Sequence, residues 1–405
     1  MKCAIIGGGA AGFFTAITLA EKNSNAQVVI FDGAKQFLRK VKISGGGRCN
    51  VTHSCFDPKE LIKNYPRGGK ELRGAFHTWQ PRDTIDWFES RGVKIKTEKD
   101  GRMFPVSDDS QSIINCLQDR ARKAGVLLRN ATGIKTITTD KNGGYELEFL
   151  NGERDQFAKV CLAVGSLKAS SIQESIITLG HTIEPLAPSL FAFDIKDSRI
   201  QDLAGIAVKH AGVRLAPKGK KQFGPVLITH RGLSGPAILR LSAWEAREME
   251  QANYDCEVEI NWLGEKNEEQ VVNQFKTLRN TKGDSFVRTK VFEEIPKRLW
   301  EKILNHAGVK ETNQWAQLPK QVEVKLINEL CNSTFHVRGK TMNKEEFVTC
   351  GGVRLKEVDF KRMESRIMPD LFFAGECLDY DGITGGFNFQ AAWTTGYIAG
   401  TAMAG

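Results

Sequence analysis

Three glycines near the start of the chain, Gly7, Gly9 and Gly12, have the spacing Gly-x-Gly-x-x-Gly. An apolar run over residues 3–6 precedes them, and a segment rich in Ala and Leu over residues 10–20 follows. In such a setting the first glycine permits a tight turn, the second lets the backbone approach a pyrophosphate, and the third lets a helix pack closely on a strand. The pattern predicts a strand, a dinucleotide-binding turn and a helix whose N-terminus stabilises phosphate charge.

An acidic residue stands where a dinucleotide-binding site of this kind places its ribose contact. Asp32 follows Gly12 by twenty residues and comes directly after a second apolar run, residues 27–31. Its carboxylate can accept hydrogen bonds from both ribose hydroxyls of an adenosine and would repel a 2′-phosphate. We therefore expect FAD or NAD rather than NADP at this turn, and the local spacing does not choose between FAD and NAD.

The far end of the chain carries a second glycine-rich stretch. An apolar run over residues 371–374 leads into Gly375 and Glu376, and Gly386 precedes an expected helix over residues 389–402. The N-terminus of a helix at this place could face an anionic reduced flavin ring, because the helix dipole stabilises negative charge there. This feature favours FAD at the glycine turn.

Five segments together carry a resemblance to a known family. They are the glycine turn, the loop Ser44-Gly-Gly-Gly-Arg-Cys-Asn-Val-Thr52, the run Arg102-Met-Phe-Pro105, the run Thr229-His-x-Gly-Leu-Ser-Gly-Pro236, and the tail that contains Gly375-Glu376 and Gly386-Phe387-Asn388-x-Gln390. From about residue 3 to about residue 400 the chain resembles the bacterial NAD(P)/FAD-dependent oxidoreductase flavoproteins that include aminoacetone oxidase and 3-dehydro-bile-acid Δ4,6-reductase.

The resemblance implies an α/β fold. It consists of a Rossmann-like FAD domain of the two-dinucleotide-binding type, interrupted by a β-barrel-like insertion with a small helical subdomain. Together with changes in sequence pattern near Pro185, Pro188 and Phe347, it places the FAD domain at residues 1–187 and 345–405. The β-rich insertion would cover residues 188–265 and 331–344, and the helical subdomain residues 266–330.

The resemblance also assigns residues to the FAD site. Asp32 stands where the family more often has Glu, and Val164 replaces a Thr near the end of an expected strand, which weakens one polar contact. The residues expected to bind FAD are Gly7, Gly9, Ala11, Gly12, Asp32, Lys40, Ser44, Gly46, Gly47, Arg48, Cys49, Asn50, Ile134, Ala163, Gly165, Gly375, Glu376, Asp379, Gly386, Phe387, Asn388 and Gln390.

Three residues are candidates for catalysis. Arg48 could stabilise reduced flavin or orient a substrate carboxylate, although it could equally bond loop carbonyls. Cys49 could form a redox pair with Cys55, but five residues separate them where the flavin disulfide reductases have four, and Cys49 could instead be a small buried residue. His230 could act as a general acid or base, and a structural role beside a helix start is at least as well supported.

The expected activity is that of an FAD-dependent oxidoreductase which moves hydride or electrons between NAD(P)H and a small organic substrate. No second Gly-x-Gly-x-x-Gly lies between a strand and a helix, so NADH or NADPH would dock transiently at the flavin. The alternatives are an oxidase of a small amine with oxygen as acceptor, a less favoured flavoprotein that modifies RNA, and a non-catalytic flavin-binding protein. The sequence does not identify the substrate, the nicotinamide, or the oligomeric state.

The composition limits the classes of partner. The 405 residues include 57 Lys and Arg against 48 Asp and Glu, a formal charge of +9, but the densest basic cluster is only Lys218, Lys220 and Lys221. Nucleic acid is therefore an unlikely partner on sequence grounds. The nine cysteines form no Cys-x-x-Cys, and no cluster has metal-ligand spacing, which favours a reducing, cytoplasmic location and no metal. No uncharged run indicates a membrane span.

Overall fold

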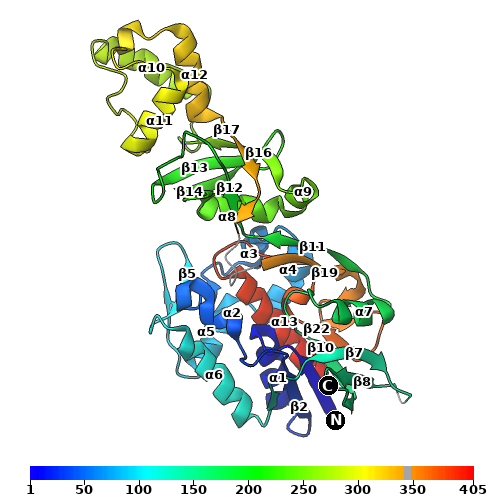
Figure 1. Cartoon of the computed structure of the whole chain (residues 1–405). Helices are drawn as coiled ribbons and strands as arrows, with labels where there is room; N and C mark the ends of the chain where they lie inside the picture. Colours follow the sequence, from blue (N-terminus) through cyan, green and yellow to red (C-terminus); the bar gives the residue numbers. More distant parts are fainter. Residues whose placement is uncertain (142, 342–347) are drawn as a thin grey trace. The chain divides into compact units, whose positions relative to one another are not determined.

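The computed structural model describes residues 1–141, 143–341 and 348–405, and the chain divides into two compact units (Figure 1). Unit 1 consists of Met1–Ala187 with Lys344–Gly405, and unit 2 consists of Pro188–Asn343. The expected boundary at residues 344 and 345 lies outside the described residues. No helix among the described residues is both long and apolar enough to cross a bilayer.

A sheet with five adjacent parallel strands forms the centre of unit 1. In spatial order the strands are β22 (Leu371–Phe373), β10 (Lys159–Leu162), β1 (Lys2–Ile6), β2 (Gln27–Phe31) and β6 (Leu127–Arg129). Two short antiparallel strands, β21 (Glu364–Ser365) and β20 (Val358–Asp359), extend the sheet beyond β22. This sheet, with helices between its strands in the sequence, confirms the expected α/β fold class.

The strand order changes direction at β1. Its neighbour β2 follows it on one side, while β10, much later in the sequence, pairs with it on the other. Open α/β sheets bind ligands beyond the carboxyl ends of their strands at such a switch point. The central strands are apolar and almost fully buried, as expected where helices cover both faces of a parallel sheet.

Two helices of unit 1 approach each other closely through small residues. A Cβ on Gly396 or Gly400 of α13 (Phe387–Ala404) would lie 2.8 or 2.5 Å from backbone oxygens of α1 (Ala10–Lys22). Because neither glycine has a side chain, the two helix backbones can pack almost in contact. This packing explains why the final helix is rich in small residues. The helix starts at Phe387, two residues before the expected start.

The remaining elements of unit 1 surround this core. Its other helices are α2 (Arg39–Ile43), α3 (Pro58–Leu61), α4 (Gly69–Thr78), α5 (Pro81–Glu89), α6 (Ser110–Lys123) and α7 (Ser170–Thr178). One small antiparallel sheet has the order β3 (Thr52–His53), β5 (Arg102–Pro105), β4 (Ile95–Thr97), and another has the order β7 (Ile134–Thr139), β8 (Tyr145–Phe149), β9 (Arg154–Phe157). β11 (Ile183–Ser189) pairs with β19 (Val348–Val353).

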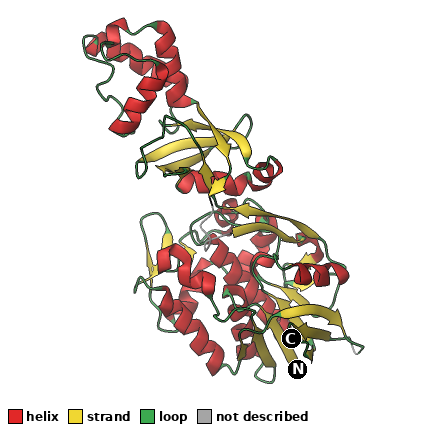
Figure 2. Cartoon of the chain, viewed as in Figure 1, coloured by secondary structure: helices red, strands yellow, loops and turns green. Residues whose placement is uncertain are grey.

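Unit 2 combines a sheet and a helical segment. Its sheet has the order β17 (Ser333–Arg338), β16 (Asp255–Asn261), β13 (Ala207–Leu215), β14 (Gln222–Ile228), β15 (Gly232–Ser234), β12 (Ala192–Asp194), β18 (Lys340–Thr341), with antiparallel pairs throughout. Its helices are α8 (Pro236–Trp244), α9 (Ala246–Gln251), α10 (Glu268–Lys282), α11 (Lys297–Ala307) and α12 (Lys320–Cys331) (Figure 2). Buried residues of the sheet, such as Ile260, and of the helical segment, such as Trp300, belong to one hydrophobic core. The structure thus groups both segments in one compact unit.

Candidate functional site

The three glycines of the first turn have three different surroundings. Gly7 has a positive φ of 110°, and a Cβ there would lie 2.3 Å from the carbonyl oxygen of Ala163 at the end of β10. A Cβ on Gly12 would lie 1.9 Å from the carbonyl oxygen of Gly7, so this glycine is needed where α1 meets β1. Around a Cβ on Gly9, in contrast, there is no described heavy atom within 4 Å. Only Gly9 opens onto space that a ligand can fill.

The N-terminus of α1 is suited to an anion. Its N-cap residue, Gly9, offers no side chain to the first N–H groups of the helix, and the first turn holds no acidic residue. These N–H groups and the helix dipole are therefore available to negative charge. An uncapped helix N-terminus beside an open glycine position fits the pyrophosphate of a dinucleotide such as FAD.

Asp32 lies at the carboxyl end of β2 and fixes the glycine turn. Its Oδ2 accepts a hydrogen bond from the backbone N–H of Gly8 at 2.8 Å, and its Oδ1 accepts one from the backbone N–H of Ala34 at 2.8 Å. Each carboxylate oxygen has a further lone pair for a ribose hydroxyl. The neighbouring segment that leads into β7 runs beside Gly33, and Ile134 on it is 8% exposed. The contact of Asp32 with the ribose and the packing of Ile134 near the adenine stay predictions.

Residues far apart in the sequence meet at the ends of β10 and β22. Lys40 forms an ion pair with Glu376 Oε2, and Glu376 Oε1 accepts a hydrogen bond from the backbone N–H of Thr349 at 3.0 Å. Gly165 has a positive φ of 72°, and a Cβ there would lie 3.7 Å from Glu376 Oε2. The structure thus gathers Lys40 and Gly165, both expected FAD-binding residues, with Glu376, which was expected beside the ribityl chain and the phosphates.

The loop that holds Gly45, Gly46 and Gly47 has an unusual backbone. The φ angles of these residues are 59°, 70° and 87°, a left-handed region that L side chains rarely adopt. A Cβ on Gly45 would meet the ring of Phe104 at 2.9 Å, whereas there is no described atom within 4 Å of a Cβ on Gly46 or Gly47. The last two glycines therefore leave an open backbone surface, which a flat ring could approach.

Asn50 connects this loop to the start of α13. In the amide orientation that pairs donors with acceptors, its side-chain N–H groups donate to the carbonyl oxygens of Thr52 and Met103 at 3.0 and 3.2 Å. Its side-chain oxygen then accepts a hydrogen bond from the backbone N–H of Gly386 at 2.9 Å. A Cβ on Gly386 would lie 2.5 Å from the carbonyl oxygen of Thr52, so only glycine fits there. These contacts hold the N-terminus of α13 beside the triple-glycine loop.

Two predicted flavin contacts in α13 use their side chains inside the protein. The amide of Asn388 accepts from the backbone N–H of Gly382 and donates to its carbonyl oxygen, both at 2.8 Å. The side-chain oxygen of Gln390 accepts hydrogen bonds from the hydroxyls of Thr52 at 2.6 Å and Thr84 at 3.1 Å. We therefore interpret both residues as positioning the helix N-terminus. Its first turn holds no acidic residue and no side-chain cap.

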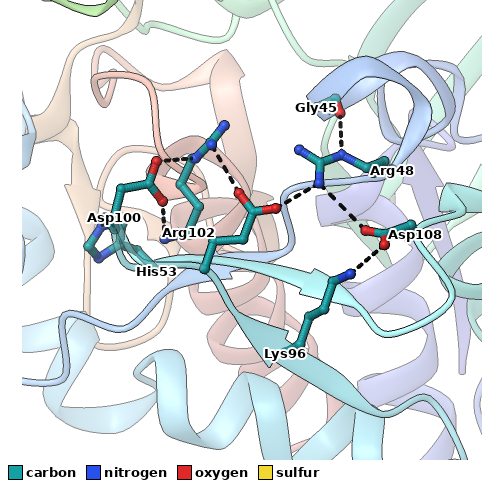
Figure 3. Close-up of polar contacts among 8 residues, drawn as sticks. Gly45, Arg48, His53, Lys96, Asp100, Arg102 and Asp108 are labelled. Carbon is teal, nitrogen blue, oxygen red and sulfur yellow. Dashed lines mark hydrogen bonds and ion pairs between the residues drawn. The ribbon is translucent and has the colours of Figure 1, made fainter. Parts of the chain in front are cut away.

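Arg48 is bound by carboxylates that the sequence analysis did not connect with it (Figure 3). Its Nη1 lies 2.7 Å from Glu98 Oε1 and 3.5 Å from Asp108 Oδ1, and its Nε donates to the carbonyl oxygen of Gly45 at 3.4 Å. The guanidinium also lies 4.0 Å from the ring centre of Phe104. The carboxylates balance the positive charge of Arg48. The contacts also hold β4 and β5 against the triple-glycine loop. They support a bracing role for Arg48.

The same ion network continues along β4 and β5. Arg102 bonds Glu98 at 3.0 Å and Asp100 at 2.7 Å, and Lys96 pairs with Asp108 (Figure 3). His53, on the adjacent strand β3, approaches the carbonyl oxygen of Asp100 with Nε2 at 3.2 Å. The two carboxylate partners of Arg48 lie at least fifty positions away in the sequence, so spacing gave no signal for them.

His53 is a site residue that the sequence analysis did not propose. Its ring stacks on Phe387, the first residue of α13, with centroids 4.7 Å apart. Burial is the largest influence on its pKa and lowers it, so the imidazole is neutral near pH 7. In the sequence, the position of His53 directly after the glycine-rich loop could have indicated that it belongs to the site.

Cys49 does not have the surroundings of a reactive thiol. Its side chain is fully buried, and burial raises its pKa to about 12. The thiolate is the reactive form, so Cys49 stays inert near neutral pH. Cys55 is partly exposed, and both cysteines are free thiols. We interpret Cys49 as a packing residue.

Alkylation of the native protein tests this interpretation. Iodoacetamide at pH 8 is expected to label Cys55 and to leave Cys49 unmodified, because a buried, protonated thiol reacts slowly. Peptide mass spectrometry measures both sites in one sample, and labelling after denaturation serves as the control. Rapid native labelling of Cys49 would contradict the packing role.

His230 belongs to unit 2, whereas Arg48 and Cys49 belong to unit 1. The side chain of His230 is exposed and lines a hollow of about 600 Å³ together with Lys196, Gln201, Asp202 and Thr229, among others. The hollow brings a titratable side chain beside both a cation and a carboxylate. A role for His230 in catalysis stays a prediction.

Comparisons with known proteins identify the family of the chain. The family model described as the HI0933-like protein Rossmann domain matches residues 1–402. The chain is 30% identical over 403 residues to the ribosomal RNA dihydrouridine synthase of Escherichia coli (strain K12), covering 97% of this chain and 95% of that protein. The protein of the same name from Haemophilus influenzae is 29% identical over 405 residues, covering 97% and 96%.

Two further similarities extend the comparison. The 3-dehydro-bile acid delta(4,6)-reductase of Clostridium scindens is 26% identical over 412 residues, covering 100% of this chain and 99% of that protein. The solved structure of 3-ketosteroid-delta4-(5alpha)-dehydrogenase from Rhodococcus jostii RHA1 aligns with a TM-score of 0.51 at 13% identity, covering 100% and 96%, and shares the fold. On the match across almost its whole length, the chain belongs to the HI0933-like Rossmann family of FAD-dependent oxidoreductases.

Proposed function

We propose that this protein is an FAD-dependent reductase that saturates the C5=C6 bond of a uridine in ribosomal RNA. The observation that carries the proposal is the similarity, near 30% identity over almost the full length, to two proteins named ribosomal RNA dihydrouridine synthase. The C5=C6 bond of uracil is conjugated to a carbonyl. Its reduction adds a hydride to C6 and a proton to C5.

This proposal reverses the order of the alternatives drawn from the sequence. The scattered basic residues gave no nucleic-acid signal, and RNA modification was the less favoured interpretation. The similarity to the two relatives now favours RNA modification. It spans 97% of the chain and therefore includes unit 2 as well as the dinucleotide site. The net charge of +9 is compatible with an RNA substrate.

The residues of unit 1 are well placed to hold the cofactor. Gly9 and the first turn of α1 would hold the pyrophosphate, Asp32 the ribose, and Glu376 with Lys40 the ribityl side. The open backbone at Gly46 and Gly47 would lie along the flavin ring. FAD, when bound, supplies the hydride for the conjugated double bond.

The chain itself would contribute charge stabilisation. The uncapped N-terminus of α13, held by Asn50, would stabilise negative charge that develops near it. NADH or NADPH is our candidate for the electron donor and would dock transiently.

Nucleoside analysis tests the proposal directly. The purified holoprotein is incubated without oxygen with NADH or NADPH and unmodified ribosomal RNA, and the RNA is digested for mass spectrometry. We expect a nucleoside two hydrogen atoms heavier than uridine, absent with a Gly9→Val variant that cannot hold FAD. Flavin reduced by the nicotinamide without any dihydrouridine in the RNA would overturn the assignment of substrate.

A second candidate function is the reduction of a small molecule that contains the same chemical group. It is favoured by the similarity to the 3-dehydro-bile acid delta(4,6)-reductase, whose name describes double bonds near a ketone. The same anaerobic assay with a steroid enone in place of RNA distinguishes the two substrates. Oxygen consumption driven by a small amine, with no response to nicotinamide, would instead indicate an oxidase.

A further inference from the structure

One face of α8 in unit 2 carries a cation that has no ion-pair partner among the described residues. Arg240 is partly buried, and a Cβ on Gly224 of β14 would lie 3.6 Å from its Nη2. Among the described residues, no carboxylate pairs with Arg240 and no acceptor receives a hydrogen bond from it. Burial lowers the pKa of the guanidinium, with no compensating charge beside it. A partly desolvated cation is costly unless an anion satisfies it, so an anion from outside the chain would be stabilised here.

An aromatic side chain lies one turn further along the same face. Trp244 follows Arg240 at the i+4 position, which places both on one side of the helix. The ammonium of Lys220 lies 4.5 Å from the ring centre of Trp244. Trp244 is only partly buried, and Lys220 and Lys218 on the β13–β14 turn are exposed. Neither lysine forms an ion pair with a residue in the described part of the chain.

The charged groups next to this face include one acid. Glu245 Oε1 accepts a hydrogen bond from the backbone N–H of Lys220 at 3.1 Å, so this carboxylate supports the turn. Lys221, the next residue, belongs to a different surface, because it lines a hollow with Glu265, Glu268 and Glu269. The basic cluster of the sequence is thus divided between two surfaces. Lys220 lies over the ring of Trp244 and Lys218 belongs to the same turn, whereas Lys221 lines a hollow with acidic residues.

We infer that Arg240, Trp244, Lys218 and Lys220, here called the α8 face, bind single-stranded RNA. Arg240 would bond a phosphate, and a base would stack on Trp244 in place of the lysine ammonium. Proteins that hold single strands combine cations along the backbone with aromatic rings under the bases. The inference rests on the proposed function in one respect, namely that RNA is the substrate. It adds the surface that holds the RNA.

Binding measurements on the full chain test the α8 face. The probe is a labelled, uridine-rich RNA of twenty nucleotides, followed by fluorescence anisotropy between 50 and 200 mM salt. Arg240→Gln is expected to weaken binding about tenfold and to lower the salt dependence by about 0.7 in slope, the value for one phosphate contact on a single strand. Trp244→Leu is expected to weaken binding about tenfold with an unchanged slope.

Matched variants keep the test specific. Lys221→Gln removes the same charge from the neighbouring position and is expected to leave binding within twofold of wild type. Arg240→Lys is expected to retain the salt slope, which a misfolded variant would not. All variants should keep the flavin absorption of unit 1. Equal affinities for Arg240→Gln and Lys221→Gln would overturn the inference.

The failure of this inference is distinguishable from that of the proposed function. Dihydrouridine formation that does not respond to Arg240→Gln or Trp244→Leu would overturn the α8 face alone. RNA binding that depends on Arg240 without any dihydrouridine would support the α8 face and overturn the proposed reaction. A wild-type chain that binds no RNA would overturn both.

Discussion

Gly9→Val is expected to abolish FAD binding while the protein stays folded. A side chain at Gly9 meets no described atom, and the residue has a φ of −91° in extended backbone, which valine adopts without strain. The added methyl groups would occupy the space in front of the N-terminus of α1, where the pyrophosphate is expected. The measurement is the flavin absorbance of the purified protein after incubation with excess FAD.

Gly12→Ala is the matched control for that prediction. Its Cβ would lie 1.9 Å from the carbonyl oxygen of Gly7, so α1 must move away from β1. We expect a loss of about 1–3 kcal/mol in the free energy of unfolding of the apoprotein, the usual cost of overpacking. Gly9→Val is expected to stay within about 1 kcal/mol of the wild-type apoprotein in the same denaturant titration. Retained flavin absorbance in Gly9→Val would refute the assignment of the pyrophosphate site.

Arg67→Met is expected to lower the free energy of unfolding by about 3–5 kcal/mol, the usual effect of removing one partner of a buried ion pair. Asp381 is fully buried, and both of its carboxylate oxygens accept hydrogen bonds from the Arg67 guanidinium at 2.6 Å. The variant leaves that carboxylate in the interior without its counter-charge. Denaturant unfolding followed by circular dichroism measures the loss.

Two further variants isolate the contribution of the pair. Arg67→Met combined with Asp381→Leu removes both charges and is expected to recover much of the stability, since no unpaired ion remains. Lys63→Met breaks an exposed ion pair with Glu60 and is expected to have little effect. A single variant Arg67→Met as stable as Lys63→Met would contradict the burial of the pair. Asp381 precedes the turn into α13, so the unstable variant is also expected to bind FAD more weakly.

The dinucleotide turn could be predicted from the sequence because its determinants are local. A strand, a turn and a helix that follow one another bring Gly7, Gly9 and Gly12 together at fixed spacing, and Asp32 ends the next strand. The sequence also indicated a helix near the C-terminus from its small residues. Its start at Phe387 depended on Gly386, whose left-handed backbone stands directly before the helix.

The roles of polar side chains could not be predicted in the same way. Gln390 and Asn388 have the residue types of flavin contacts, but in the structure they bond Thr52 and Gly382. Arg48 has the residue type of a flavin-stabilising cation, but Glu98 and Asp108 surround it. A side chain bonds whichever partner the fold brings within reach, and that partner need not be near in the sequence.

The sequence by itself determined the α/β class and the place of the dinucleotide turn, because periodicity and glycine spacing are properties of short segments. It indicated the family through the resemblance that five segments carry together. Only the tertiary structure decided which glycine faces open space, and that Lys40 meets Glu376 and Arg67 meets Asp381 across more than 300 residues. It also separated Lys220, whose ammonium lies over the ring of Trp244, from Lys221, which lines a hollow with Glu265 and Glu268. The physical reason is that burial, charge pairing and close packing depend on contacts between distant segments, which the folded chain alone establishes.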